Sequence, residues 1–449
     1  MTSRALFGTD GVRGVANVDL TPDIAMGLAR AAGEGRSGTA VVGRDTRRSG
    51  QMLAAAVHAG FQSAGLDTID LGIVPVGAVS HFTVERRAVF GVMVSASHNP
   101  APDNGIKFFG ADGSKLDDEQ EAAIESRLRH GPGAASARGA DLGIGFTAPD
   151  AVERYVEAIA AGAEFGLGGI EVAMDCANGA AFLAGPRLFE RLGAAVEAHA
   201  VEPSGMNIND DCGATRPEFI AGLAGGRIGL SFDGDADRLI AVDEDGVVVN
   251  GDVIMAILAR HLRGRDQLPG NRVVATVMSN LGFRLAMRTL GLEVVETRVG
   301  DRYVLEEMRR TGAGLGGEQS GHVIFRGRPT GDGLFTAMRL LEVVAATGAP
   351  LRELRRVMEE LPQVLRNVTV RVKERLPDSE AVWAAVAMME KRLGDEGRVL
   401  VRASGTEPLV RVMVEGRDPQ RIEAAAGRIA VAIREALAAG PVDLKRARR

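Results

Sequence analysis

The chain has 449 residues, of which 45% are hydrophobic and 25% charged, a balance typical of globular proteins. This length predicts several domains rather than one. The 59 acidic and 53 basic residues give a net charge of −6, which disfavours nucleic-acid binding as the main role.

Features that would place the chain outside the cytosol are also missing from the sequence. The N-terminal residues lack the apolar core of a signal peptide. No stretch approaches about 20 consecutive apolar residues, so we expect no membrane span. Cys176 and Cys212 offer neither a disulfide framework nor a metal-thiolate pattern, which suits a reducing compartment. We therefore expect a cytoplasmic protein.

Strand and helix patterns alternate along the first part of the chain, which predicts parallel α/β layers. The predicted elements begin, in order, at Thr21 (helix), Ala40 (strand), Ser49 (helix), Thr68 (strand) and Ala88 (strand). The first helix has a threonine at its cap and a proline in its first turn. Residues 131–149 are rich in glycine and alanine without periodicity and are predicted to be a linker.

The alternation then restarts more than once. Later predicted elements begin near Val152 (helix), Ile170 (strand), Arg227 (strand), Gly251 (helix), Arg272 (strand), Glu293 (strand) and Arg302 (helix), with a helix between the last two strands. After Pro362 we predict a strand, a helix around Trp383, strands near Val399 and Leu409, and a helix from Asp418. The chain is thus predicted to hold four domains, the first three α/β and the last smaller and α+β: 1–145, 150–249, 250–361 and 362–449.

A tight polar turn follows the strand from Ala88. It reads Ser95-Ala96-Ser97-His98-Asn99-Pro100 and exposes one hydroxyl at a constrained position. Alone, this pattern is typical of a turn in which Ser97 and Asn99 bond the backbone. A serine that carries phosphate also needs a proton acceptor and nearby positive charge, which His98 and Lys107 can supply.

Three carboxylates, of Asp233, Asp235 and Asp237, alternate after the strand from Arg227. Their mutual repulsion calls for a cation, and oxygen ligands favour Mg²⁺ or Ca²⁺. An EF-hand loop would place glycine where Arg238 stands, and the flanks are predicted strands rather than helices. A dehalogenase-type phosphatase, with Asp233 as nucleophile, and a solvated acidic turn are the other interpretations. We favour metal binding.

Two further loops carry groups that bind sugars and phosphates. Gly316-Gly317-Glu318-Gln319-Ser320-Gly321-His322 presents a carboxylate, an amide and a hydroxyl between glycines. Arg402-Ala403-Ser404-Gly405-Thr406-Glu407-Pro408, with Arg411 beyond, offers guanidinium groups, hydroxyls and open backbone N–H groups, which suit a phosphate. The P-loop nucleotide motif is absent from the sequence.

Taken together and in this order, the motifs GTDGVRG, SASHNP, DGDADR, GEQSGH and SGTEP resemble the α-D-phosphohexomutase superfamily along essentially the whole chain. Within it, GEQSGH, VGDRYV and NINDDCGAT are most similar to the bacterial-type phosphoglucosamine mutase family. The departures, at Val94-Ser95 and Ala403, do not touch the proposed chemistry. The resemblance implies four domains around a central cleft, and a homodimer is an expectation at the level of the family.

The resemblance also implies a role for each loop. Ser97 would be a phosphoserine, and Mg²⁺ held by Asp233, Asp235 and Asp237 would also contact its phosphate. The remaining catalytic candidates are Arg13, His98, Lys107 and Arg238, with Lys107 a candidate for proton transfer. The sugar would be bound by Glu318, Ser320 and His322, and the non-reacting phosphate by Arg402, Ser404, Gly405, Thr406 and Arg411.

The implied reaction interconverts glucosamine 6-phosphate and glucosamine 1-phosphate through glucosamine 1,6-bisphosphate, and it would feed UDP-N-acetylglucosamine synthesis. The expected partner is thus a small sugar phosphate, with no nucleic acid and no membrane. Two alternatives stay open: a mutase of the phosphomannomutase/phosphoglucomutase type that prefers glucose or mannose phosphates, and a metal-dependent phosphatase with Asp233 as nucleophile.

Overall fold

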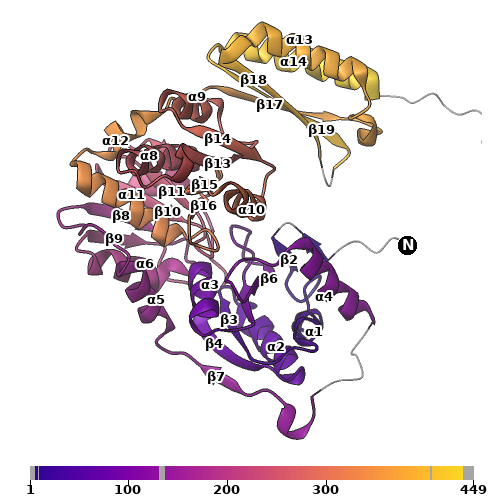
Figure 1. Cartoon of the computed structure of the whole chain (residues 1–449), viewed down its shortest axis with the longest axis vertical. Coiled ribbons are helices and arrows are strands. Elements are labelled where there is room, and N and C mark those ends of the chain that lie inside the picture. The colour runs from indigo at the N-terminus through magenta and orange to yellow at the C-terminus, as the bar shows by residue number, and fades with distance from the viewer. Residues whose placement is uncertain (1–5, 9, 131–136, 405–406, 438–449) are drawn as a thin grey trace, which may run out of the picture. The chain divides into compact units, whose positions relative to one another are not determined.

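The computed structural model describes residues 6–8, 10–130, 137–404 and 407–437 (Figure 1). These residues form two compact units, the larger within Met1–Ser279 and Leu290–Val357, and the smaller within Asn280–Thr289 and Met358–Arg449. In the described ranges, no single helix has the length and apolar composition needed to cross a membrane. One bent pair, Gly333–Thr347 with Leu351–Val357, meets those two criteria jointly.

The first sheet of the larger unit contains both parallel and antiparallel strands. Strands β3, β4, β5 and β7 run parallel, whereas β6, β2 and β1 continue the sheet in antiparallel pairs. The strand order is β1-β2-β6-β5-β3-β4-β7. The strands are β1 (Phe7–Gly8), β2 (Gly11–Val15), β3 (Thr39–Arg44), β4 (Asp67–Ile73), β5 (Phe90–Val94), β6 (Asp103–Gly110) and β7 (Gly145–Thr147).

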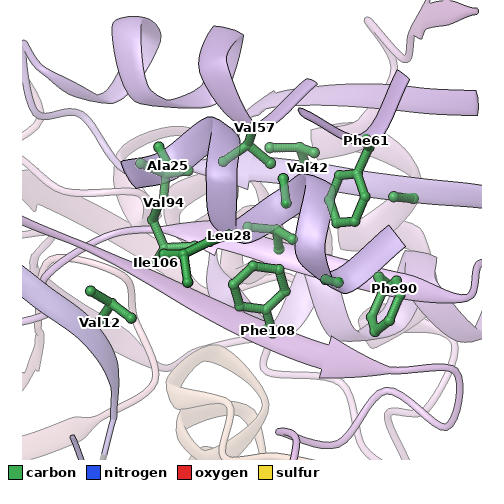
Figure 2. Close-up of a cluster of buried hydrophobic side chains, with 14 of the residues drawn as sticks. Val12, Ala25, Leu28, Val42, Val57, Phe61, Phe90, Val94, Ile106 and Phe108 are labelled. Carbon is green, nitrogen blue, oxygen red and sulfur yellow. The ribbon is translucent and has the colours of Figure 1, made fainter. Parts of the chain in front are cut away.

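Helices α1 (Pro22–Gly33) and α2 (Gly50–Ser63) pack on this sheet through an aliphatic and aromatic core (Figure 2). Leu28, Val57 and Phe61 are fully buried there against strand residues such as Val42. Thr21 caps α1 by accepting a hydrogen bond from the Ile24 N–H, as predicted. Also in this region are α3 (Val76–Glu85) and α4 (Asp118–His130).

Two more sheets complete the larger unit. The second has the order β12-β11-β10-β8-β9 and the third β14-β13-β15-β16. The second comprises β8 (Glu171–Asp175), β9 (Ala195–His199), β10 (Ile228–Phe232), β11 (Leu239–Val242) and β12 (Val248–Val249), accompanied by α5 (Ala151–Ala160), α6 (Ala181–Arg191) and α7 (Pro217–Leu223). The third comprises β13 (Arg272–Thr276), β14 (Glu293–Thr297), β15 (Leu315–Gly317) and β16 (Val323–Phe325), accompanied by α8 (Gly251–Gly264), α10 (Asp301–Thr311), α11 (Gly333–Thr347) and α12 (Leu351–Leu354).

The smaller unit is an antiparallel sheet covered by helices. Its strands are β17 (Gln363–Thr369), β18 (Gly397–Ala403) and β19 (Leu409–Gly416), in the order β17-β19-β18. Helices α13 (Glu380–Leu393) and α14 (Pro419–Leu437) contribute to its core. Helix α9 (Leu281–Thr289) belongs to this unit, because the Asn280 side chain before it donates to the Leu361 carbonyl and accepts from the Leu361 N–H.

The prediction of α/β layers followed by a smaller α+β region is confirmed by these sheets. The prediction of an irregular linker over residues 131–149 is wrong near its end, because Gly145–Thr147 forms strand β7 beside β4. All three residues of β7 are exposed, so hydrophobicity gives no signal for this edge strand. The domain boundaries at 145/150, 249/250 and 361/362 stay predictions.

Candidate functional site

Ser97 lies in a buried turn directly after β5. Its side chain is almost completely buried, and its backbone φ of +52° is unusual for a residue other than glycine. The Ser97 N–H donates to Ser95 Oγ over 2.9 Å, and Ser95 Oγ donates to Asp45 Oδ2 over 2.7 Å. The turn therefore presents the Ser97 hydroxyl in one fixed direction.

The three aspartates of the DGDADR loop follow β10 and lie together. One oxygen of each, from Asp233, Asp235 and Asp237, lies within 4.8 Å of the others, and all three residues are buried. Ser97 Oγ donates a hydrogen bond of 2.5 Å to Asp233 Oδ2. Asp233 Oδ1 accepts from the N–H of Arg238 over 3.1 Å, which turns the loop back on itself.

The chemistry of this carboxylate group fits a divalent cation. Oδ1 of Asp235 and Oδ1 of Asp237 are buried without a hydrogen-bond partner among the described residues. Burial and the neighbouring carboxylates of Asp237 and Asp235 raise the pKa of Asp233 well above its usual range. Three ionised carboxylates are thus unfavourable here without added positive charge, and oxygen ligands of this kind suit Mg²⁺.

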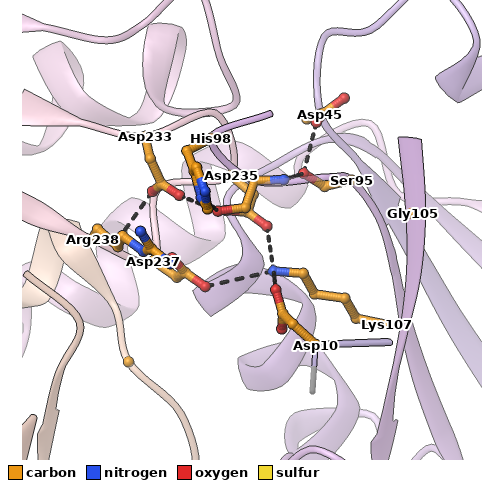
Figure 3. A network of polar contacts seen from close by, with 12 residues as sticks. Asp10, Asp45, Ser95, His98, Gly105, Lys107, Asp233, Asp235, Asp237 and Arg238 are labelled. Atoms are coloured by element: carbon orange, nitrogen blue, oxygen red, sulfur yellow. Dashed lines mark hydrogen bonds and ion pairs between the residues drawn. The ribbon is translucent and has the colours of Figure 1, made fainter. Parts of the chain in front are cut away.

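Lys107, on β6, is buried among carboxylates (Figure 3). Its Nζ lies 2.8 Å from Asp235 Oδ2, 3.0 Å from Asp10 Oδ2 and 3.6 Å from Asp237 Oδ2. Burial alone would lower the pKa of Lys107, but Asp10, Asp235 and Asp237 raise it above its ordinary value. Lys107 is therefore a cation in this site.

A closed ring of lysine, histidine and carboxylate side chains runs on from Lys107. Lys107 and Lys115 both pair with Asp10, and Lys115 Nζ also lies 2.5 Å from Asp301 Oδ2. The His322 ring lies 3.4 Å from Asp301 and 3.5 Å from Asp237. Asp237 closes the ring on Lys107. Burial would raise the pKa of Asp10, but Lys107, Lys115 and Arg13 hold it well below its usual range. We call these six residues the charge ring: Asp10, Lys107, Lys115, Asp237, Asp301 and His322.

The GEQSGH loop is the hairpin between β15 and β16. The Glu318 N–H donates to the His322 carbonyl, so these two residues lie at its stem, while Ser320 is exposed at its tip. Glu318 Oε1 accepts from the Gly300 N–H over 3.0 Å. An isolated β-bridge between Arg238 and His322 joins this hairpin to the DGDADR loop.

A cavity of about 900 Å³ adjoins these groups in the larger unit. Most of the predicted reacting and sugar-binding side chains meet there: Arg13, His98, Asp237, Arg238, Glu318 and His322. Burial, Arg238 and Arg13 lower the pKa of His98 to about 4, so this imidazole is neutral at pH 7. Its Nδ1 lies 3.3 Å from Ser97 Oγ.

The predicted phosphate loop lies in the smaller unit. Arg402 on β18 and Arg411 on β19 are directly opposite in the antiparallel register, so their side chains share one face. Ser404 Oγ accepts from the Glu407 N–H, and Lys373 Nζ donates to the Ser404 and Glu407 carbonyls. Gly405 and Thr406 lie outside the described residues. Like charges opposite one another are unfavourable, and Glu407 Oε2 offsets part of this charge by accepting from Arg411 Nη2 over 3.1 Å.

Several polar residues of the larger unit's site were missed by sequence reasoning. Asp10 lies within GTDGVRG and Asp301 within VGDRYV, so the motifs contained a signal for both. Asn209 likewise lies within NINDDCGAT, whereas Lys115 and Arg47 gave no signal that marks a site. Arg47 and Asn209 bond the Ser97 turn, and Lys115 pairs with Asp10 and Asp301.

Comparisons with known proteins agree with this geometry. Residues 4–132, 250–361 and 365–432 match the family models described as phosphoglucomutase/phosphomannomutase alpha/beta/alpha domain I, alpha/beta/alpha domain III and C-terminal domain. A relative named phosphoglucosamine mutase, from Symbiobacterium thermophilum, is 52% identical over 445 residues, covering 96% of this chain and 99% of the relative.

Solved structures share the fold. A phosphoglucomutase/phosphomannomutase family protein from Burkholderia thailandensis superposes with a TM-score of 0.82 at 27% identity, covering 97% of this chain and 98% of that one. The N-acetylphosphoglucosamine mutase of Aspergillus fumigatus, solved with GlcNAc-6P and magnesium, gives a TM-score of 0.69 at 18% identity, with 96% of each chain covered. At that identity the likeness concerns the fold alone.

Proposed function

Because this chain belongs to the phosphoglucosamine mutase family, a branch of the phosphoglucomutase/phosphomannomutase isomerases, we propose that it interconverts glucosamine 6-phosphate and glucosamine 1-phosphate. The observation that carries the proposal is the buried Ser97 hydroxyl, bonded to one carboxylate of an aspartate group with which Lys107 and Arg238 pair. This arrangement suits a reusable phosphoryl carrier.

In the proposed reaction, Ser97 enters as a phosphoserine. The C1 hydroxyl of glucosamine 6-phosphate attacks the phosphorus, the new C1–O–P bond forms and the bond from phosphorus to Ser97 Oγ breaks. The product of this half-reaction is glucosamine 1,6-bisphosphate, which reorients and returns its 6-phosphoryl group to Ser97. The proton lost by the C1 hydroxyl balances the one gained by Ser97 Oγ, so the cycle releases glucosamine 1-phosphate without net consumption of protons.

The main requirement of such a step is positive charge placed beside the negatively charged oxygens of the transferring phosphoryl group. Arg13 and Arg238 line the cavity, and the Nε of each has no hydrogen-bond partner among the described residues, although Arg238 Nε lies 3.8 Å from Asp237 Oδ1. Each guanidinium group would thus have a donor to offer a phosphate. Mg²⁺, held by Asp233, Asp235 and Asp237, would offset further negative charge. We assign proton transfer to Lys107, whose Nζ lies 2.8 Å from Asp235 Oδ2 at the edge of the aspartate group.

The remaining loops are assigned to substrate recognition. Glu318, at the stem of its hairpin and on the cavity wall, would accept hydrogen bonds from sugar hydroxyls, together with Ser320 and His322. In the smaller unit, Arg402, Ser404 and Arg411, with Gly405 and Thr406 of the same loop, would bind the phosphate that is not being transferred. A single loop of this composition would then accept either end of the bisphosphate.

The proposal is tested by kinetics on glucosamine, glucose and mannose 6-phosphates with a trace of the matching bisphosphate, together with peptide mapping of the phosphorylated enzyme. We expect the highest kcat/KM for glucosamine 6-phosphate and phosphate on Ser97. A higher kcat/KM for glucose 6-phosphate would indicate the phosphoglucomutase alternative. Phosphate on Asp233, or full turnover by Ser97→Ala, would support the phosphatase alternative instead.

A further inference from the structure

The backbone of Ser97 is held in a conformation that serine does not adopt readily. A positive φ is unfavourable for a residue that carries a Cβ, so the surrounding structure must impose it. The turn carries several backbone carbonyls that face inward and need donors. The side chains that supply those donors also set the direction of the Ser97 hydroxyl.

Arg47, in the turn after β3, supplies most of them. Its Nη2 donates to the carbonyls of Ser97 (2.9 Å) and Asn99 (2.7 Å). Its Nη1 donates to the carbonyls of Pro100 (2.5 Å) and Asp103 (2.9 Å). Its Nε donates to Asp45 Oδ2 over 2.8 Å, and both side chains are fully buried. Every donor of the guanidinium group is therefore used.

Because all its donors are used within the protein, Arg47 differs from the side chains that would neutralise the phosphate. Its charge is compensated by Asp45, and no N–H group remains to bind a ligand. Asp45 in turn accepts from Ser95 Oγ, the same oxygen that accepts from the Ser97 N–H. Arg47 thus holds the turn by direct hydrogen bonds to its carbonyl groups and, through Asp45 and Ser95, by an indirect link to the N–H of Ser97.

Asn209 makes a second, independent contact with the same carbonyls. Its Nδ2 donates to Ser97 O over 2.9 Å and to Asn99 O over 3.1 Å. Asn209 precedes β10 in the chain, as part of the region that leads to the aspartate loop. The carrier turn and that region are therefore connected by hydrogen bonds that do not involve the reacting groups.

The geometry points to Arg47 as a positioning residue for phosphoryl transfer, with Asn209 as its partner on the second sheet's side; this rests on the proposed function. Arg47 fixes the turn so that Ser97 Oγ meets Asp233, and it does so by a planar fork of donors rather than by charge. Lysine keeps the charge but has three donors on one nitrogen and cannot reproduce that fork.

The test compares Arg47→Lys and Asn209→Ala with Arg48→Lys, a matched control at the exposed neighbouring arginine. Steady-state kcat and KM for glucosamine 6-phosphate are measured with primer, and hydrogen exchange of the peptide spanning 95–104 is measured by mass spectrometry. We expect Arg47→Lys to lower kcat about 10- to 100-fold, to leave KM within about twofold and to speed exchange of that peptide. Arg48→Lys should match the wild type in both measurements.

Several results would overturn the inference. The first is a wild-type kcat in Arg47→Lys, with or without faster exchange of the 95–104 peptide, which would indicate a structural role only. The second is a rise in KM with no change in kcat. If Arg47→Lys does not fold, Asn209→Ala decides, because it is expected to lower kcat at least threefold and wild-type kcat would overturn the inference. A wild-type enzyme that does not convert glucosamine 6-phosphate overturns the proposed function. The same variants are then compared on glucose 6-phosphate and mannose 6-phosphate, and wild-type kcat in Arg47→Lys on the substrate that is turned over would overturn the inference.

Discussion

Replacement of Lys115 by methionine would test the charge ring. Lys115 is only 9% exposed and pairs with Asp10 and Asp301. At an effective dielectric constant of 20, unit charges 2.5 Å apart attract by about 7 kcal/mol, against a desolvation penalty of several kcal/mol for each ion. Removing one member of such a buried pair leaves uncompensated charge, so we expect Lys115→Met to lower the free energy of unfolding by about 3–5 kcal/mol.

Urea unfolding followed by circular dichroism measures this loss. The single tryptophan, Trp383, lies in the smaller unit, so its fluorescence follows a part of the chain that does not contain Lys115. Lys391→Met, at an exposed lysine of α13, is the control and should stay within about 0.5 kcal/mol of the wild type. Adding Asp301→Asn to Lys115→Met should restore part of the stability, because it removes one unpaired charge. A loss below about 1 kcal/mol for Lys115→Met, the range of exposed ion pairs, would refute the reasoning.

Three further changes test other parts of the site. Asp235→Asn should raise the Mg²⁺ concentration needed for half-maximal activity about tenfold or more, and full wild-type turnover after chelation would contradict the metal role. Burial raises the pKa of Glu121 to about 7, although Arg302 lies 2.8 Å away. Between about pH 4.5, the pKa in the unfolded chain, and about pH 7, the folded protein keeps a proton that the unfolded chain has lost. The free energy of unfolding therefore falls as the pH rises through this range. Glu121→Gln should remove up to about 2 kcal/mol of that fall, measured by urea unfolding at pH 5 and 8, and an unchanged difference would count against the shift. Gly251→Ala would place a Cβ 2.1 Å from the Glu318 carbonyl and should raise KM for the sugar phosphate, unlike Gly264→Ala in the same helix, where the Cβ meets open space.

The sequence was most informative where a motif follows a strand. Ser97 after β5 and Asp233 after β10 were recognisable because an apolar run ends abruptly in polar residues. Their hydrogen bond was not predictable by pattern, since 136 positions separate them and only the packing of two sheets brings them together. Lys107 was noted as a cation downstream of the Ser97 turn, and the resemblance added its proton-transfer role. It lies inside a strand of apolar residues, where local hydrophobicity alone would have placed its charge at the surface.

The residues that escaped prediction share a physical property. Arg47, Lys115 and Asn209 act through partners that are remote in sequence, so no local spacing identifies them. The same holds for β7, whose pairing with β4 depends on backbone hydrogen bonds rather than on apolar side chains. Local patterns therefore located the loops, whereas the network that orients them required the structure.

The backbone at Ser97 also limits which alcohol the enzyme can use. Threonine carries the same hydroxyl, but its branched Cβ is strongly disfavoured at a φ of +52°. Conversion of Ser97 to threonine therefore requires the turn to change shape before any difference in reactivity matters. Under the proposed function, stereochemistry at Cα limits the choice of phosphoryl carrier as much as the oxygen does, and a redesign aimed at a threonine carrier would have to rebuild the turn first.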